Sequence, residues 1–161
     1  MSEKAVAGSF AVRRMTQDDL ALALSWAVEE GWNPGHNDAQ CFYTADPNGF
    51  LIGLLNGEPV SSLSAVTYDS SFGFLGLYIV KPAVRGFGYG VSLWKVGIDY
   101  LGMRRIGLDA VQAQERNYEK WGFTAAYHHI RHEGVGGGDA RHLPRAAGIG
   151  MIRSGPSRLD T

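Results

Sequence analysis

The chain has a single cysteine, Cys41, among its 161 residues. This excludes an intrachain disulfide and a cysteine-rich zinc site. The neighbouring residues Gln40 and Phe42 supply no positive charge that would stabilise a thiolate. We therefore expect Cys41 to be a buried, unreactive thiol.

Long apolar runs and an excess of charge of one sign are also missing. Uninterrupted apolar stretches such as residues 77–80 are far shorter than the ~20 residues that a membrane-spanning helix needs. Residues 1–7 place an acidic residue beside a lysine and contain no hydrophobic segment of a secretory signal. Fifteen Lys and Arg against sixteen Asp and Glu give a formal net charge of −1, which argues against nucleic acid as a partner. We expect a soluble, cytoplasmic protein with no membrane partner.

The composition fits one folded domain. Hydrophobic residues make up 45% of the chain and charged residues 19%, so one core can form. Glycine is abundant, at 22 of 161 residues, about twice its usual ~7% share. We predict a single domain over residues 1–161, in which residues 133–161 are either mobile or contribute a last strand.

The first third of the chain predicts a strand followed by two helices. Residues 10–13 alternate as in a strand, and Thr16 with Asp19 has the spacing of a capping box at the start of a helix. That helix is expected to end near Glu30, before a glycine. A short second helix is predicted over residues 39–43.

Three consecutive strands follow. Residues 50–55 and 60–68 flank Asn56 and Gly57, a pair that adopts the positive φ angles of a type I′ hairpin turn. Residues 72–80 form the next strand pattern. These segments predict an antiparallel meander.

The remaining pattern predicts a parallel crossover. A helix over residues 91–102 leads to a strand over 106–111, which must run parallel to the strand before the helix. A short helix is expected over 117–121, and further strands over 123–131 and 149–152. The fold class is therefore α+β, a mixed and mostly antiparallel twisted sheet of six or seven strands flanked by about four helices.

A glycine-rich segment lies between the strand and the helix of this crossover. Gly86, Gly88 and Gly90 allow close approach of the backbone, several N–H groups converge there, and Arg85 adds a positive charge. We expect a pyrophosphate site. The Walker A motif is excluded because no Gly-Lys-Ser/Thr follows, and the dinucleotide-binding fingerprint because Val91 occupies its third glycine position.

The same segment resembles motif A of the GNAT superfamily of N-acetyltransferases. The motif has the form Arg-x-x-Gly-x-Gly, here Arg85, Gly88 and Gly90. It follows a strand ending in Val-x-Pro, here Val80 and Pro82.

A second segment supports the resemblance. Residues 118–123, Tyr-Glu-Lys-Trp-Gly-Phe, are similar to the Tyr-Glu-Lys-x-Gly-Phe segment of that superfamily. The motifs cover about residues 72–131, and the order of elements before them agrees with the family layout. The resemblance implies a GNAT-like fold, acetyl-CoA as cofactor and CoA as product.

It also implies which residues contact the cofactor. Main-chain groups of Tyr78, Ile79 and Val80 are expected to meet the pantetheine arm and the thioester carbonyl, where an N–H stabilises the oxyanion. The family carries an asparagine several residues ahead of the tyrosine of the second segment, and its side chain contacts the cofactor arm. Asn117 is too close to that tyrosine to be its equivalent. The candidate substitutes are Gln114 and Gln112. The residues expected around the pyrophosphate are Arg85, Gly86, Phe87, Gly88, Tyr89 and Gly90.

For catalysis, the resemblance implies that Tyr118 is the general acid that protonates the departing thiolate. The acceptor amine also needs a base, for which Glu30 is the first candidate and Glu29 and Asp38 are alternatives. The simpler explanation of the two glutamates is that they are solvated charges at a helix end, and that of Asp38 is an N-cap.

The acceptor itself is not identified by any motif. Trp32 and Phe42 are candidates for the border of its pocket, with core packing as the alternative. His128 and His132 would share a strand face, but no carboxylate spacing accompanies them, and no metal site is predicted.

The predicted function is therefore an acetyl-CoA-dependent N-acetyltransferase. It would move an acetyl group to a primary amine of a small molecule or peptide by direct attack, because no credible covalent nucleophile is present. The alternative is a non-catalytic acyl-CoA-binding module that acts as a sensor or assembly partner. Homodimers are common in the superfamily, and the sequence maps no interface for one.

Overall fold

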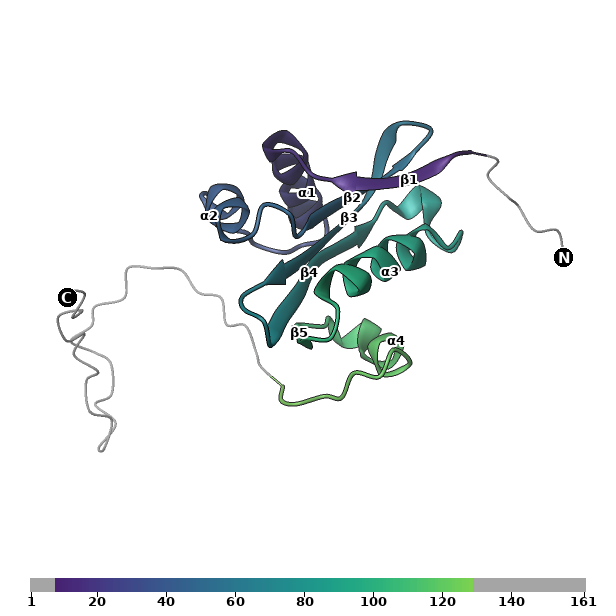
Figure 1. Ribbon diagram of the computed structural model, residues 1–161. Coiled ribbons are helices and arrows are strands. Elements are labelled where there is room, and N and C mark those ends of the chain that lie inside the picture. Colours follow the sequence, from purple (N-terminus) through teal and green to yellow (C-terminus); the bar gives the residue numbers. More distant parts are fainter. Residues whose placement is uncertain (1–7, 129–161) are drawn as a thin grey trace, which may run out of the picture.

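The computed structural model describes residues 8–128, which form a mixed sheet with helices on both faces (Figure 1). The strand order is β1-β2-β3-β4-β5, with the first four strands antiparallel and β5 parallel to β4. The strands are β1 (Phe10–Arg14), β2 (Phe50–Leu55), β3 (Glu58–Thr67), β4 (Phe72–Val80) and β5 (Arg105–Leu108). The helices are α1 (Gln17–Glu29), α2 (Asp38–Ala45), α3 (Tyr89–Leu101) and α4 (Glu115–Glu119), with 3-10 turns at Pro82–Val84 and Gln112–Gln114.

The predicted α+β class, meander and parallel crossover are confirmed, and the strand count is lower. Five strands lie within residues 8–128, against the six or seven expected. Residues 123–128 form no strand, so the prediction for 123–131 is wrong over that part. Residues 129–131 and the strand predicted over 149–152 lie outside the described residues, as does His132.

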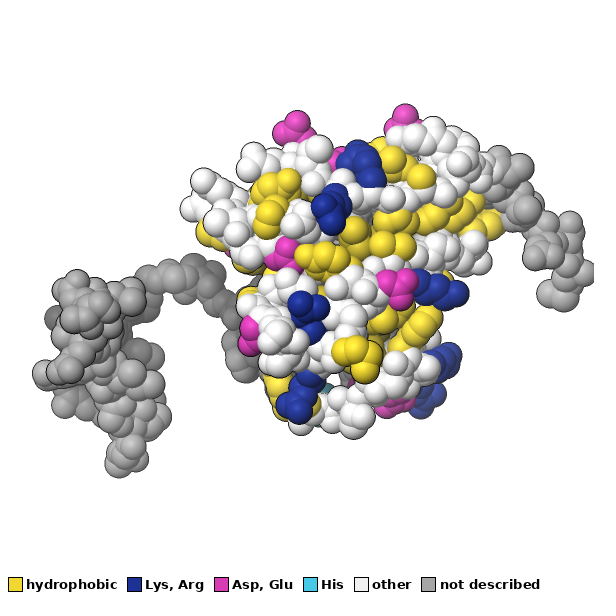
Figure 2. All heavy atoms as spheres, viewed as in Figure 1, with side chains coloured by type: hydrophobic (Ala, Val, Ile, Leu, Met, Phe, Trp, Pro, Cys, Tyr) yellow, Lys and Arg dark blue, Asp and Glu magenta, His cyan; other side chains and the backbone are white. Residues whose placement is uncertain are grey.

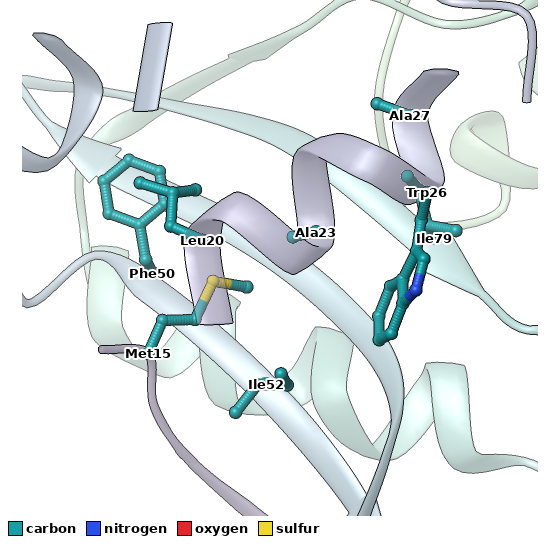
Figure 3. Packing of buried hydrophobic residues seen from close by; sticks show 8 residues of the cluster. All are labelled: Met15, Leu20, Ala23, Trp26, Ala27, Phe50, Ile52 and Ile79. Atoms are coloured by element: carbon teal, nitrogen blue, oxygen red, sulfur yellow. The ribbon is translucent and has the colours of Figure 1, made fainter. Parts of the chain in front are cut away.

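Two hydrophobic clusters hold the helices to opposite faces of the sheet. Figure 3 shows α1 packed on β2 and β4, with Leu20, Ala23 and Trp26 directed at the strands. The second cluster lies on the other face, where Leu93, Trp94 and Leu101 of α3 pack on the sheet. The strand residues of the second cluster are Leu51, Leu63, Ala65 and Leu75.

Local turn chemistry explains two predicted boundaries. Asn56 and Gly57 have φ angles of 54° and 88°, as the type I′ turn requires. The Asp19 N–H donates to Thr16 Oγ1 at 3.2 Å, and the Thr16 N–H donates to Asp19 Oδ2 at 2.7 Å. The capping box at the start of α1 is therefore confirmed.

Two predictions for α2 are wrong. Asp38 is the first residue of the helix, and Asn37 is the N-cap. The Asp38 carboxylate accepts the Gly35 N–H at 2.7 Å and caps no N–H of α2. Cys41 is exposed and not buried. Ala39 and Tyr43 face the α1 cluster, and at 100° per residue Cys41, two positions from each, points to the opposite side of the helix.

On the face drawn in Figure 2, acidic and basic side chains are scattered among the described residues, and neither kind forms a broad patch. Over residues 8–128, no helix is both long and apolar enough to cross a membrane.

A buried carboxylate ties the turn before β2 to β3 and α3. Asp46 is 7% exposed, and it accepts the Thr67 N–H at 2.9 Å, the Thr67 hydroxyl at 2.7 Å and the Tyr100 hydroxyl at 3.0 Å. Burial by itself raises the pKa of Asp46, but these bonds and the Asn48 N–H outweigh it, so that its pKa lies below the usual value. Asp46 is therefore a charged structural residue at neutral pH.

We expect Asp46→Ala to lower the free energy of unfolding at pH 7 by roughly 2–4 kcal/mol, because the Thr67 N–H and the Tyr100 hydroxyl lose a charged acceptor. A carboxyl whose pKa is lowered by folding stabilises the fold above its unfolded pKa of ~3.9, and this contribution disappears as the pH falls through the folded value. The difference between wild type and variant in urea unfolding should therefore shrink between pH 7 and pH 3. Asp99→Ala, at an exposed site one residue from Tyr100, is the control. An equal loss in both variants contradicts the role of Asp46.

Candidate active site

The site begins at the free edge of β4. β4 pairs with β5 only from Phe72–Arg105 to Leu75–Leu108, while β4 itself continues to Val80. β5 ends at Leu108, earlier than the predicted residue 111, so residues 76–80 of β4 lack a partner strand on that side among the described residues.

Main-chain groups of β4 face this edge. The Lys81 N–H donates to Val60 O of β3 at 2.9 Å, whereas Val80 O accepts Arg85 Nε on the opposite side at 2.7 Å. Because main-chain directions alternate along a strand, the N–H groups of Tyr78 and Val80 point to the free edge. Ile79, the third strand residue predicted to contact a cofactor, turns its main chain to β3 and its side chain into the α1 cluster.

A cavity of about 1270 Å³ runs along this edge from α1 and α2 to the loop before α3. Of the residues nominated from the sequence, all except Phe87, Tyr89, Glu29 and Gln112 lie on its wall. The side of the wall toward α3 and α4 includes Val84, Arg85, Gly86, Gly88, Gly90, Trp94, Gln114, Asn117 and Tyr118. The side toward α1 and α2 includes Leu24, Glu30, Trp32, Pro34, Asp38, Phe42, Val66, Tyr68 and Phe74.

The glycines of the loop have two different functions. Gly86 and Gly88 both have φ +85°, a left-handed conformation that favours glycine. Gly88 is the N-cap of α3, and no side chain caps the helix, so first-turn N–H groups are available to an anion. Gly90 instead permits close packing, because a Cβ there would stand 2.6 Å from the Tyr78 hydroxyl and 2.9 Å from Val80 Cγ2. The ring of Phe87 stacks on Tyr89, away from the cavity, with 6.3 Å between centroids.

An ion pair joins the two sides of the cavity. The Arg85 guanidinium donates through Nη2 to Glu30 Oε1, while its Nε holds Val80 O. Glu30 is the C-cap of α1, 55 residues from Arg85 in the chain. Both side chains are partly exposed, at 49% and 34%, so the pair contributes at most about 1 kcal/mol to stability. The first candidate base and the charged residue of the glycine loop are thus in contact.

Residues 15–123 match the family model described as the acetyltransferase (GNAT) family. The chain belongs to this family. The curated holothin acyltransferase of Pseudoalteromonas sp. (strain SANK 73390) is 39% identical over 118 residues, which are 73% of this chain and 40% of that relative. The chain therefore spans about two fifths of the length of that relative.

Solved structures share the GNAT fold at low sequence identity. Ard1 from Thermoplasma volcanium superposes with a TM-score of 0.62 at 16% identity, covering 71% of this chain and 82% of that one. A predicted acetyltransferase from Clostridium acetobutylicum, crystallised with acetyl-CoA, gives 0.59 at 16% identity, covering 78% and 96%. Glucosamine-6-phosphate N-acetyltransferase from Arabidopsis thaliana gives 0.56 at 14% identity, covering 78% and 98%.

The residues of this GNAT chain fit an acyl-CoA. Two left-handed glycines and the uncapped start of α3 present N–H donors to a pyrophosphate, and Arg85 lies beside them. The outward N–H groups of Tyr78 and Val80 suit the amides of an extended arm, as an added strand would.

Tyr118 lies on the wall in α4, half-buried against Trp94 and Phe123 at centroid distances of 5.5 and 6.2 Å. Burial raises its pKa above the usual value. Burial, with the nearby Tyr118, raises the pKa of Tyr78 to about 12. Both phenols therefore carry a proton at neutral pH and can donate it in a hydrogen bond.

Polar groups also lie beside Tyr118. Asn117 Nδ2 donates to Gln114 Oε1 at 2.6 Å, and both residues lie on the cavity wall. Asn117 is too close to Tyr118 in the sequence to replace the family's asparagine, yet it lies beside Gln114 at the cavity. Trp94 of α3 is buried. It also forms part of the wall, and helical periodicity alone cannot separate a core residue from one beside a ligand site.

Proposed function

We propose that the chain is an N-acyltransferase that uses acetyl-CoA and acetylates a primary amine by direct attack. The observation that carries this proposal is one cavity bounded by the glycine loop, the free edge of β4, Tyr118 and the carboxylate of Glu30. Bound acetyl-CoA supplies an activated thioester carbonyl.

Each wall has a defined task in this proposal. The glycine loop and the start of α3 hold the pyrophosphate, and the outward N–H groups of β4 orient the arm and the carbonyl. Glu30 accepts the proton that the acceptor ammonium must lose before its nitrogen can attack. Tyr118 donates a hydrogen bond to the departing sulfur.

The first test is thermal melting with CoA, acetyl-CoA, ATP and NAD. A ligand that binds the native state at 100 times its Kd adds ~2.7 kcal/mol, a shift of roughly 5–10 °C for a domain of this size. A shift with CoA and acetyl-CoA alone supports the proposed cofactor, and no shift with any ligand overturns the proposal. Release of free CoA thiol with an amine then separates an enzyme from the alternative, a non-catalytic acyl-CoA-binding module.

The walls toward α1 and α2 favour an apolar acceptor. Trp32, Phe42 and Phe74 line that side, and the acidic groups among the described residues there are Glu30 and Asp38, which suit an ammonium group. The amine panel should therefore contain holothin, the acceptor in the relative's name, and aromatic amines, alongside polyamines and peptides. Faster turnover of polyamines than of aromatic amines contradicts an apolar acceptor.

We expect Tyr118→Phe to lower kcat by roughly 2- to 12-fold, the effect of one hydrogen bond of about 0.5–1.5 kcal/mol. A larger loss is not expected, because a phenol with a raised pKa transfers its proton uphill to a thiolate whose conjugate thiol has a pKa of ~8.5. Steady-state kinetics from pH 6 to 10 check this. For the same reason the wild-type profile should have no basic limb from Tyr118 below pH ~10. A loss above 100-fold means that full proton transfer from Tyr118 is required.

A further inference from the structure

The free edge of β4 contains a bulge. Ser64 of β3 pairs with Gly76, and Ser62 pairs with Ile79, so β4 has one residue more than β3 over this interval. Leu77, inside the bulge, has φ +46°, a left-handed conformation that is unfavourable for a residue with a Cβ. Such a conformation persists only where its surroundings fix it.

The bulge reverses the alternation of the strand. Leu75 packs in the α3 cluster, and so does Tyr78, three residues later, where a regular strand would place it on the opposite face. Leu77 and Ile79 both pack in the α1 cluster. Which N–H groups reach the cavity is therefore decided at this bulge.

One buried side chain holds the bulge. Ser62 is 0% exposed, and its Oγ donates to the Leu77 carbonyl at 2.7 Å. The Leu77 carbonyl and the Tyr78 N–H belong to one planar trans peptide group and point in opposite directions. A hydroxyl that holds the carbonyl from the β3 side therefore aims the Tyr78 N–H at the cavity.

We infer that Ser62 is a positioning residue for acyl transfer, which it serves by fixing the peptide between Leu77 and Tyr78. This inference rests on the proposed function. The acceptor ammonium first gives one proton to Glu30. As its nitrogen then attacks, a C–N bond forms, the C–S bond breaks and the sulfur leaves with the electron pair, and the second proton of the nitrogen goes to that sulfur, so that CoA leaves as its thiol. The Tyr78 N–H donates to the carbonyl oxygen while negative charge develops on it, and a donor fixed in advance stabilises that charge best.

The neighbouring serine provides a matched control. Ser61 is also 0% exposed and lies on β3, but its hydroxyl has no hydrogen-bond partner in the part of the chain that the structure describes, and it is not on the cavity wall. Ser61→Ala and Ser62→Ala thus remove the same atom from equally buried sites, and only Ser62→Ala releases the Leu77 carbonyl.

The experiment measures kcat for acetyl transfer and the Kd of CoA, which has no acyl carbonyl. Ser62→Ala should lower kcat about 10-fold and leave the Kd of CoA within twofold. The expected loss is smaller than the 10²–10³-fold that follows removal of an oxyanion-hole donor, because the Tyr78 N–H is still present and only its orientation is less fixed. Ser61→Ala should change neither value. Ser62→Cys, of similar size and with a weaker donor, should fall between wild type and Ser62→Ala.

Backbone amide NMR gives a readout that does not depend on turnover. The Tyr78 amide resonance should move in Ser62→Ala and stay in place in Ser61→Ala. Equal kcat in the two alanine variants, or a loss in Ser62→Ala that parallels a loss of CoA binding, overturns the role of Ser62 and leaves the proposed function standing. A wild-type chain that binds no CoA and acetylates no amine overturns both.

Discussion

Gly88→Val should weaken CoA binding by about 100-fold or more while the protein still folds. Gly88 has φ +85°, where a residue with a Cβ is strained by roughly 1–2 kcal/mol. A Cβ built at this position lies in open space, with no protein atom within 4 Å apart from its chain neighbours. Its effect therefore falls on the ligand, because the side chain stands beside the N–H groups at the start of α3. Loss of two charge-assisted hydrogen bonds of about 1.5 kcal/mol each corresponds to that factor.

Gly57→Val separates strain from ligand contact. Gly57 has φ +88° and also nothing within 4 Å of a Cβ, but it lies in the β2–β3 hairpin. Both variants should melt a few degrees lower than wild type, and Gly57→Val alone should keep its affinity for CoA in isothermal titration. If Gly88→Val binds CoA within threefold of wild type, the loop does not hold the pyrophosphate.

Elements with local chemistry could be predicted from the sequence. The hairpin was predictable because Asn56 and Gly57 suit the positive φ angles of its turn, and the start of α1 because Thr16 and Asp19 satisfy each other's N–H groups. The glycine segment between β4 and α3 was recognisable for the same kind of reason, since few residues other than glycine adopt φ +85°, and the structure places Gly86 and Gly88 on the cavity wall.

Features set by tertiary packing could not be predicted. Nothing in the sequence marks Leu77 for a left-handed conformation, because the bulge results from seating Leu75 and Tyr78, three residues apart, on one face of the sheet and Leu77 on the other. The burial predicted for Cys41 is wrong for the same reason, since the orientation of the short α2 follows from the contacts of Ala39 and Tyr43 with α1. The pairing of Glu30 with Arg85 depends on how α1 is placed across β4, and no local pattern encodes it.

That pairing leads to an expected result with two opposite effects. Glu30→Gln should tighten CoA binding by about 2- to 5-fold, because Arg85 loses the carboxylate that competes with phosphate for its guanidinium, a contact worth up to about 1 kcal/mol. The same substitution should lower kcat/KM for the amine by about 100-fold, because the base is lost.

Arg85→Gln should weaken CoA binding by about 10-fold and make that binding less dependent on salt, because the positive charge beside the phosphates is lost.

Glu29→Gln is the matched control, since Glu29 is exposed, adjacent in the chain and absent from the cavity wall, and it should change neither value. The pH dependence then distinguishes a base from a binding group. An amine near its own pKa, ~10.4 for a lysine-like acceptor, arrives partly deprotonated and needs no base, so the defect of Glu30→Gln should shrink as the pH rises toward that value. A defect that stays constant with pH would mean that Glu30 binds the acceptor and another group accepts the proton. Tighter CoA binding without any loss of turnover would leave Glu30 as a partner of Arg85 alone.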